Sequence, residues 1–309
     1  MNSSRFWIGW LASALALGGA ALAGDAATTR AVSHSEALEA GRLMRLAADR
    51  DPREIPIFGA SKAEANYMPE ALGPNFYNYG LASASPDVVN WLLAMELQTP
   101  SRAPIVIDLV QWPFEGVGDP RNYLPLADRA DTRAMLARAD VWCPHYAIPG
   151  LRYFGSWDWY AKGLLTDRIA MTKRVVRGYV HHLDQAPWDA ETFRRDVDRR
   201  LAAPPLRFGL HPRQTGRLLA LMRAAPERRF VIVLSPLHRA FLTRSSGEAD
   251  LHRGLAALQA AAPNLLVIDM TRATYPDRYW LNTGHLNETG ARAFSGDLRA
   301  ALIKQEIIG

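Results

Sequence analysis

Short apolar runs of strand length alternate with helical patterns along most of this 309-residue chain. The runs are apolar throughout rather than at every second residue, as expected for strands that are covered on both faces. The strand candidates are Ile55–Phe58, Phe76–Tyr79, Pro104–Val110, Phe230–Ser235 and Leu265–Met270. Repeated strand–helix alternation predicts a mostly parallel sheet with helices on both sides, and sites in such sheets form at the carboxyl ends of the strands.

The segments between these strands carry helix signals. Ser85-Pro86 pairs a capping residue with a proline in the first helical position. Patterns rich in Leu and Ala predict helices over Thr215–Ala224 and Asp250–Ala260, and Asn287 can cap a last helix with one apolar face.

A long insertion, at about residues 112–213, interrupts the alternation. It is rich in Trp, Tyr, Arg and Asp, and its stretches Ala130–Ala139 and Ala190–Leu201 predict helices. Its tryptophans, Trp188 among them, indicate a folded segment, in which they either form a core or stack on sugar rings.

The first 23 residues have the pattern of an export signal. Met1–Arg5 is short and basic, Phe6–Ala23 is apolar, and Ala21-Leu22-Ala23 is a small-x-small site. The apolar run is at the lower limit for a membrane span, so a retained anchor is the alternative to a cleaved signal. In both cases we expect the remaining chain in the periplasm or cell envelope.

Residues 24–50 are expected to form a flexible leader, Gly24–Val32, followed by a helix. Ser33-x-x-Glu36 has the spacing of a capping box, and the helix after it is expected to end near Asp49. Residues 51–309 then form one main domain that contains the insertion.

The composition of the chain limits the disulfides, partners and metals that we expect. The only cysteine is Cys143, so no disulfide forms within the chain. The net charge of +5 suits acidic glycans or phospholipid surfaces, or simply reflects an arginine-rich composition, and we expect no nucleic-acid partner. His181 and His182 point apart on an expected helix and lack further ligands, so we expect neither metal nor cofactor.

Ser61 allows two interpretations. It follows the first strand and Gly59, at a strand-to-helix turn where a nucleophile and the amides of a helix start would lie together. However, Ser61-x-x-Glu64 is also a capping box, in which the hydroxyl would only bind the amide of Glu64.

Near the other end, Asn282 stands three residues before His285, in a loop ahead of the final helix. This spacing lets one side chain orient the imidazole through Nδ1–H while Nε2 faces a nucleophile. Gly80, after the second strand, could offer a backbone amide at the same edge of the sheet.

Together these segments resemble the SGNH (GDSL-type) hydrolase family, and more closely its cell-envelope branch of polysaccharide acyl esterases and O-acyltransferases. The resemblance rests on Gly59-Ala60-Ser61, Asn78-Tyr79-Gly80, Asn282-Thr283-Gly284-His285 and the stretch FVIVLSPLHRAF that begins at Phe230. It implies a three-layer α/β sandwich with a flavodoxin-like parallel sheet of about five strands. It also implies Ser61 as nucleophile, His285 as base, and an oxyanion hole that contains the amides of Ser61 and Gly80.

Two departures from the family pattern stand out. The family places an oxyanion asparagine after the third strand, where this chain has Asp108-Leu109-Val110-Gln111, so Gln111 could donate instead. The family acid is replaced by Asn282, and Asp277 and Asp269 are the nearest carboxylates that could substitute. Asp108 and His238 are further candidates to line the cleft.

We therefore expect an exported serine esterase or O-acyltransferase that acts on acyl groups, such as acetyl, of an envelope or secreted polysaccharide. A membrane acyltransferase is a candidate partner. The alternative is a catalytically degenerate subunit that binds glycan or serves as a scaffold in a polysaccharide modification or export complex, an interpretation that Asn282 favours.

Overall fold

A computed structural model describes residues 3–36, 38–48, 50–109, 116–165, 173–182 and 187–309. The chain divides into two compact units. Unit 1 comprises Met1–Arg45 and Asp119–Thr172, and unit 2 comprises Leu46–Gly118 and Lys173–Gly309. The predicted insertion is thus shared, with residues 119–172 in unit 1 and the residues after them in unit 2.

Unit 2 is built on a five-stranded parallel sheet. Its strands lie in the order β2-β1-β3-β7-β9, which is 2-1-3-4-5 along the chain and hence the flavodoxin-like order. Their bounds are Ile55–Phe58 (β1), Phe76–Asn78 (β2), Ile105–Asp108 (β3), Phe230–Leu234 (β7) and Leu265–Asp269 (β9). All five predicted strands are confirmed to within two residues at the ends that the structure describes.

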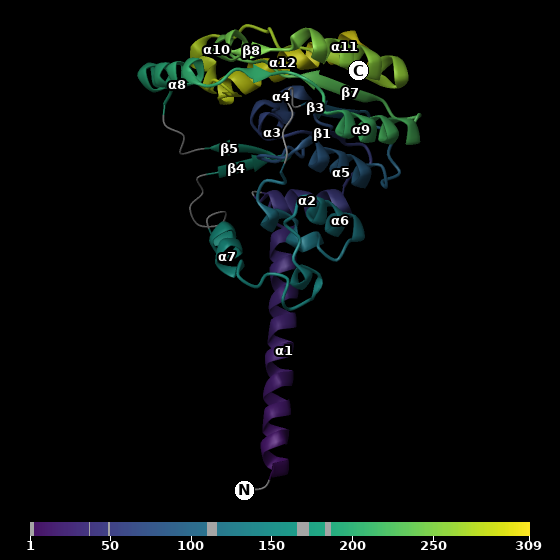
Figure 1. Ribbon diagram of the computed structural model, residues 1–309, viewed down its shortest axis with the longest axis vertical. Coiled ribbons are helices and arrows are strands. Elements are labelled where there is room, and N and C mark those ends of the chain that lie inside the picture. The colour runs from purple at the N-terminus through teal and green to yellow at the C-terminus, as the bar shows by residue number, and fades with distance from the viewer. Residues whose placement is uncertain (1–2, 37, 49, 110–115, 166–172, 183–186) are drawn as a thin grey trace. The chain divides into compact units, whose positions relative to one another are not determined.

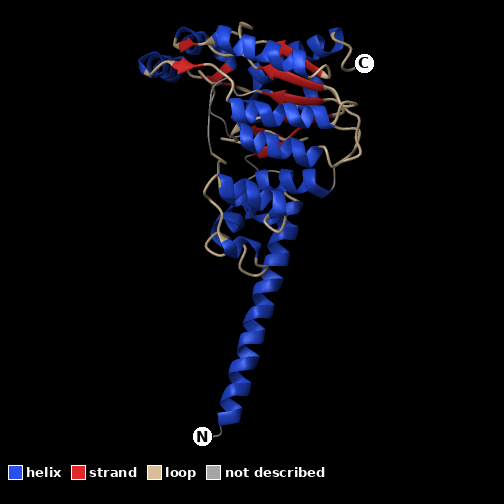
Figure 2. Ribbon diagram, turned by 45° about the vertical axis from the view of Figure 1, so that its right-hand side comes forward, coloured by secondary structure: helices blue, strands red, loops and turns tan. Residues whose placement is uncertain are grey.

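Helices cover both faces of the sheet, which makes three layers (Figures 1 and 2). One face packs against α3 (Ser61–Asn66), α4 (Pro69–Leu72) and α12 (Glu288–Lys304), around Tyr67, Phe294 and Leu298. The helix α9 (Pro212–Ala224) packs against both α5 (Pro86–Glu96) and α11 (Glu248–Ala261), and α5 contacts β1 while α11 contacts β9. The predicted caps are confirmed in position, because Ser85 precedes α5 and Asn287 Oδ1 accepts from Gly290 N, 3.0 Å away.

Smaller elements complete unit 2. They are β4 (Lys173–Val176), β5 (Tyr179–His182), α8 (Ala190–Ala202), β6 (Leu206–Arg207), α10 (Arg239–Thr243), β8 (Ser245–Ser246), η4 (Asp277–Tyr279), β10 (Trp280–Asn282) and β11 (His285–Leu286). The expected helix at His181 and His182 is wrong, since both residues belong to the β4–β5 hairpin. His181 Nε2 lies 2.9 Å from Glu70 Oε2, and its Nδ1 lies 3.2 Å from Glu288 Oε1.

Unit 1 contains α1 (Ser3–Ser33), η1 (Pro120–Leu126), α6 (Ala130–Arg138), η2 (Pro144–Ala147) and α7 (Trp157–Leu165), and α2 (Glu39–Ala48) begins in it. The flexible leader predicted at Gly24–Val32 is instead helical, because its alanines favour continuation of α1. The capping box predicted at Ser33 does not start a helix, since α1 ends there. Among the described residues, one helix, within Trp7–Ser33, is long and apolar enough to cross a membrane, as a signal or an anchor would be.

Candidate functional site

Ser61 lies where β1 turns directly into α3. The turn is tightly packed, because a Cβ on Gly59 would lie 2.6 Å from Ala63 Cβ and 2.9 Å from Asp108 Cβ. Ala60 is the N-cap of α3, and no side chain caps this helix. The capping interpretation of Ser61 is therefore wrong. Its Oγ instead lies 2.9 Å from Nε2 of His285.

His285 is held by a hairpin that follows the last strand of the sheet. The antiparallel strands β10 and β11 pair Asn282 with His285, and the amide of Leu286 donates to Asn66 Oδ1, 3.0 Å away on α3. This bond ties the hairpin to the helix that carries Ser61. A serine and a histidine separated by 224 positions therefore meet, as the sequence predicted.

Asn282 contacts the other side of the imidazole. Its Oδ1 accepts from Nδ1 of His285 at 3.0 Å, from the backbone amide of His285 at 3.0 Å and from that of Gly284 at 2.9 Å. The two backbone amides can only donate, so they fix the orientation of the side-chain amide, with its oxygen toward the ring. Nδ1 consequently carries the proton, and Nε2 is left to accept from the Ser61 hydroxyl.

Neither carboxylate predicted to substitute for the missing acid contacts His285 in this way. Asp277 Oδ1 lies 3.3 Å from Nε2 of His238, and Asp269 Oδ2 lies 3.2 Å from Nε2 of His252. The atom that accepts from Nδ1 of His285 is the side-chain amide oxygen of Asn282. The triad geometry is therefore present with a neutral third member.

The surroundings of His285 favour its uncharged form. Burial is the largest cause of a lowered pKa for His285, and the positive charge of Lys62 lowers this pKa further. The carboxylates of Glu64, Asp108 and Asp196 oppose this effect. An imidazole with a lowered pKa is ready to accept a proton at neutral pH.

Lys62 is a feature that the sequence interpretation missed. The residue follows Ser61 directly and is buried, and burial lowers its pKa while Asp108 opposes the shift. A lysine next to a candidate nucleophile in the sequence was a signal, but the sequence could not tell that its ammonium points inward.

Asp196 was also missed. Its Oδ2 accepts from the backbone amide of Thr283 at 2.7 Å, so a carboxylate from α8 holds the turn between Asn282 and His285. It also raises the pKa of His285. No sequence signal identifies it, since α8 carries a second aspartate, Asp198, in the same arginine-rich context.

The geometry does not support the oxyanion role predicted for Gly80. Its amide donates to Asn78 Oδ1 at 2.8 Å, inside the fold. A Cβ at this position would lie 2.4 Å from the amide nitrogen of Glu64, so the glycine is required for close packing against α3. Gln111 lies outside the described residues. The amide of Ser61, the first residue of α3, is the predicted oxyanion donor that this geometry leaves in place.

The two predicted cleft residues are buried in the fold instead. His238 is 3% exposed; its Nδ1 accepts from Ala240 N at 3.2 Å, which caps α10, and its Nε2 faces Asp277. Asp108 is 1% exposed, and its Oδ1 accepts from the hydroxyl of Tyr67 at 2.8 Å. Neither side chain is exposed on the surface, and Asp108 is among the residues that line a small pocket beside the end of β3.

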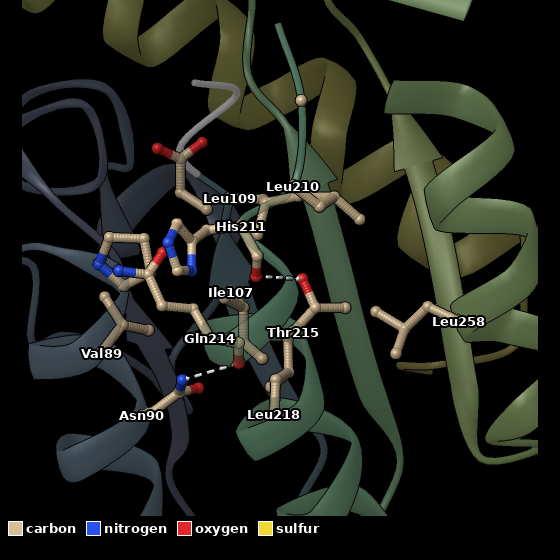
Figure 3. A pocket seen from close by; sticks show the side chains of 13 residues that line it. Val89, Asn90, Ile107, Leu109, Leu210, His211, Gln214, Thr215, Leu218 and Leu258 are labelled. Carbon is tan, nitrogen blue, oxygen red and sulfur yellow. Dashed lines mark hydrogen bonds between the residues drawn. The ribbon is translucent and has the colours of Figure 1, made fainter. Parts of the chain in front are cut away.

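Unit 2 has hollows near the ends of its strands, and two of them bear on the site. A pocket of about 40 Å³, lined by apolar side chains such as Val89, Leu210 and Leu218 together with Asn90 and Gln214, lies beside the end of β3 (Figure 3). It is large enough for little more than a water molecule or a small apolar group. Neither Ser61 nor His285 lines it.

An open groove of about 510 Å³ borders the hairpin that carries His285. Trp280 and Leu281 of β10 form one part of its lining, and Arg278 of η4 with residues at and just before the starts of α8 and α12 forms the rest. The indole of Trp188 is 41% exposed there, near the charged side chains of Arg278 and Glu288. Across the described residues, no group of three or more His, Cys, Asp or Glu side chains could hold a metal ion.

Comparison with known proteins identifies no family. No family model and no curated protein matches the chain. A solved structure described as "a putative platelet activating factor from Streptococcus pneumonia" is similar over 85% of this chain and 90% of that chain, at 12% identity and a TM-score of 0.42.

Proposed function

We propose that this protein is an exported serine acyl hydrolase or O-acyltransferase of the SGNH type that acts on acyl groups, such as acetyl, of a cell-envelope polysaccharide. The observation that carries the proposal is the connected series Ser61 Oγ, His285 Nε2, His285 Nδ1 and Asn282 Oδ1, with distances of 2.9 and 3.0 Å. A hydroxyl, a general base and a group that orients the base are the components of nucleophilic acyl transfer.

The reaction would proceed in two steps. Ser61 Oγ attacks the acyl carbonyl carbon as its proton passes to Nε2 of His285, and the amide of Ser61 donates to the developing oxyanion. The carbon–oxygen bond to the sugar then breaks, and His285 returns the proton to the departing hydroxyl. Water or a second sugar hydroxyl next attacks the acyl-serine and gives its proton to His285, which passes it back to Ser61.

The groove beside β10 supports a glycan as the substrate. It is open, and it combines the exposed indole of Trp188 with the charged side chain of Arg278 and the amide side chain of Asn287. Sugar rings present apolar faces that stack on aromatic side chains and hydroxyls that bind polar ones. A chain of sugars in this groove would pass along the hairpin that carries His285.

Turnover of a small aryl acetate tests the proposal. We expect slow hydrolysis by the wild-type chain, and a loss of about 10³-fold or more in Ser61→Ala and His285→Ala, because each variant removes a member of the reacting unit. Hydrolysis that persists at the wild-type rate in Ser61→Ala would assign the activity to another site.

A second function is favoured by two specific observations. Asn282 places no negative charge beside the imidazole of His285. The backbone amide of Gly80 already donates its hydrogen bond to Asn78 within the fold. Both features suit a non-catalytic subunit that binds or positions glycan. Glycan binding that is unchanged in Ser61→Ala, with no turnover in the wild type, would favour this alternative.

A further inference from the structure

The helix α1 consists of two different halves. Between Arg5 and Asp25 it carries no charged residue, and large apolar side chains such as Trp7, Trp10 and Leu17 are more than 60% exposed. At a rise of about 1.5 Å per residue, this uncharged half is about 28 Å long, close to the thickness of a bilayer's hydrocarbon core.

The second half of α1 is part of the folded core of unit 1. The carboxylate of Asp25 is buried, 3.7 Å from Arg152, and Thr29 Oγ1 lies 2.6 Å from the hydroxyl of Tyr153. Val32 is fully buried in a cluster with Leu124, Tyr153 and Tyr160. The helix runs without a break through Ala21-Leu22-Ala23, the predicted cleavage site, so this segment is not the exposed loop that proteases prefer.

Four large apolar side chains of unit 1 are exposed just after η2. We call them the collar: Ile148 at 47%, Leu151 at 45%, Phe154 at 72% and Trp157 at 38% exposed. A soluble surface rarely gathers such side chains within ten residues unless something covers them.

The collar lies beside α1 at the end of its uncharged half. A Cβ on Gly150 would lie 3.3 Å from Ala21 Cβ, and a Cβ on Gly24 would lie 3.4 Å from the ring of Trp157. In Figure 1, the teal chain that leads into α7 runs beside α1, and α7 contacts α1. The collar is therefore continuous with the apolar surface of the helix and lies at the level where a spanning segment would leave the hydrocarbon.

From this continuity we infer that α1 is retained as a membrane anchor and that the collar inserts into the interfacial layer of the same bilayer. Lipid covers both surfaces because they form one apolar surface. Aromatic side chains such as Phe154 and Trp157 are typical of the boundary between hydrocarbon and water. The buried Asp25–Arg152 pair then holds unit 1 at a fixed depth on the membrane surface.

Single-cysteine probes in the full chain test this inference. In a Cys143→Ser background, Phe154→Cys carries an environment-sensitive fluorophore, and the protein is reconstituted into vesicles of phosphatidylcholine and phosphatidylglycerol. We expect a blue-shifted emission that nitroxide on the lipid acyl chains quenches. The matched control is Ala137→Cys, exposed on α6, whose probe should be quenched by aqueous iodide and not by the lipid nitroxide.

Two outcomes would overturn the inference. If the mass of the membrane-bound protein shows a chain that begins at Gly24, α1 is not a retained anchor. If the Phe154 probe responds to iodide as the Ala137 probe does, or is shielded from both quenchers, water or a protein partner covers the collar instead of lipid. None of these results depends on Ser61, so the proposed enzymatic function is tested separately.

Discussion

At the scale of single residues, the side chain of Asn282 determines what the site can do. In serine proteases, replacing the triad aspartate by asparagine lowers turnover by about 10⁴-fold, because the amide stabilises the wrong imidazole tautomer. Here two backbone amides hold Oδ1 toward the ring, so the productive tautomer is retained. What the site lacks is the negative charge that would stabilise the imidazolium.

Asn282→Asp should therefore raise the turnover of an aryl acetate. The carboxylate can accept the same three hydrogen bonds, and a charged acceptor contributes about 1 kcal/mol more than a neutral one, or about 5- to 10-fold in rate. The measurement is kcat in the variant against the wild type. A decrease would show that the asparagine amide has a role of its own in the site.

The pH dependence of kcat/KM should reflect His285, which must be uncharged to accept the proton. Because burial and Lys62 lower its pKa from the ordinary value of 6.5, we expect half-maximal activity at a pH below 6.5, with activity lost as the pH falls further. Asp196→Asn removes a charge that raises this pKa, so the midpoint should move lower still.

Asp198→Asn, on the exposed side of the same helix, is the control and should leave the midpoint unchanged. A titration of the His285 ring by NMR measures the same pKa without activity. Equal midpoints in Asp196→Asn and the wild type would limit Asp196 to a structural role in holding the turn at Thr283.

At the scale of elements, close packing of β2 against α3 positions Ser61. Gly80→Ala places a methyl group 2.4 Å from the amide nitrogen of Glu64, so α3 has to move. We expect a loss of about 1–3 kcal/mol in the free energy of unfolding, together with lower turnover. Denaturant melts and aryl acetate kinetics measure the two effects.

The control for this prediction is Gly216→Ala on α9, where no atom lies within 4 Å of the new methyl group. Alanine is the better helix former, so this variant should gain about 0.5–1 kcal/mol. Stability unchanged in Gly80→Ala would mean that the contact between β2 and α3 is looser than the distances indicate.

A comparison of the elements with their predictions shows which features of the fold and site the sequence could predict. The strands were predictable because runs such as Phe230–Ser235 are apolar on both faces, and no polar alternative competes for them. The meeting of Ser61 and His285 was predictable because parallel strands end at one edge of the sheet. The roles of Gly80, His238 and Asp196 could not be predicted. They depend on which neighbouring side chain makes a hydrogen bond with a given amide or imidazole, and tertiary packing decides this.

Local signals failed where tertiary contacts decided the outcome. Ser61-x-x-Glu64 matches a capping box, but Ala60 occupies the cap and the serine hydroxyl turns to His285. His181 and His182 carry no periodic signal, and their pairing with β4 makes them strand residues.

At the scale of the molecule, unit 2 contains a buried ionic cluster. The carboxylate of Glu96 lies 2.9 Å from Arg50 Nε and 2.6 Å from Arg228 Nη2, and all three side chains are at most 1% exposed. Arg228 also donates to the carbonyls of Ser101 and Ala103, at 2.8 Å each, which connects α5 to the start of β3.

Glu96→Ala should lower the free energy of unfolding by about 3–5 kcal/mol, because it leaves two buried guanidinium groups without their carboxylate. Glu248→Ala, which removes the partner of the largely exposed Arg272, should lower the free energy of unfolding much less, because water screens an exposed ion pair. Chemical denaturation of the two variants measures the difference. Equal losses would show that the Glu96 cluster is more hydrated than its burial indicates.

The central claim is that Ser61 is an activated nucleophile, and covalent labelling tests it most directly. The full-length protein is treated with a fluorophosphonate, digested and mapped by mass spectrometry, with Ser61→Ala and His285→Ala treated in parallel. We predict one adduct, on Ser61, that is absent in Ser61→Ala and strongly reduced in His285→Ala. No adduct on Ser61 in the wild type, or equal labelling in His285→Ala, would contradict the claim.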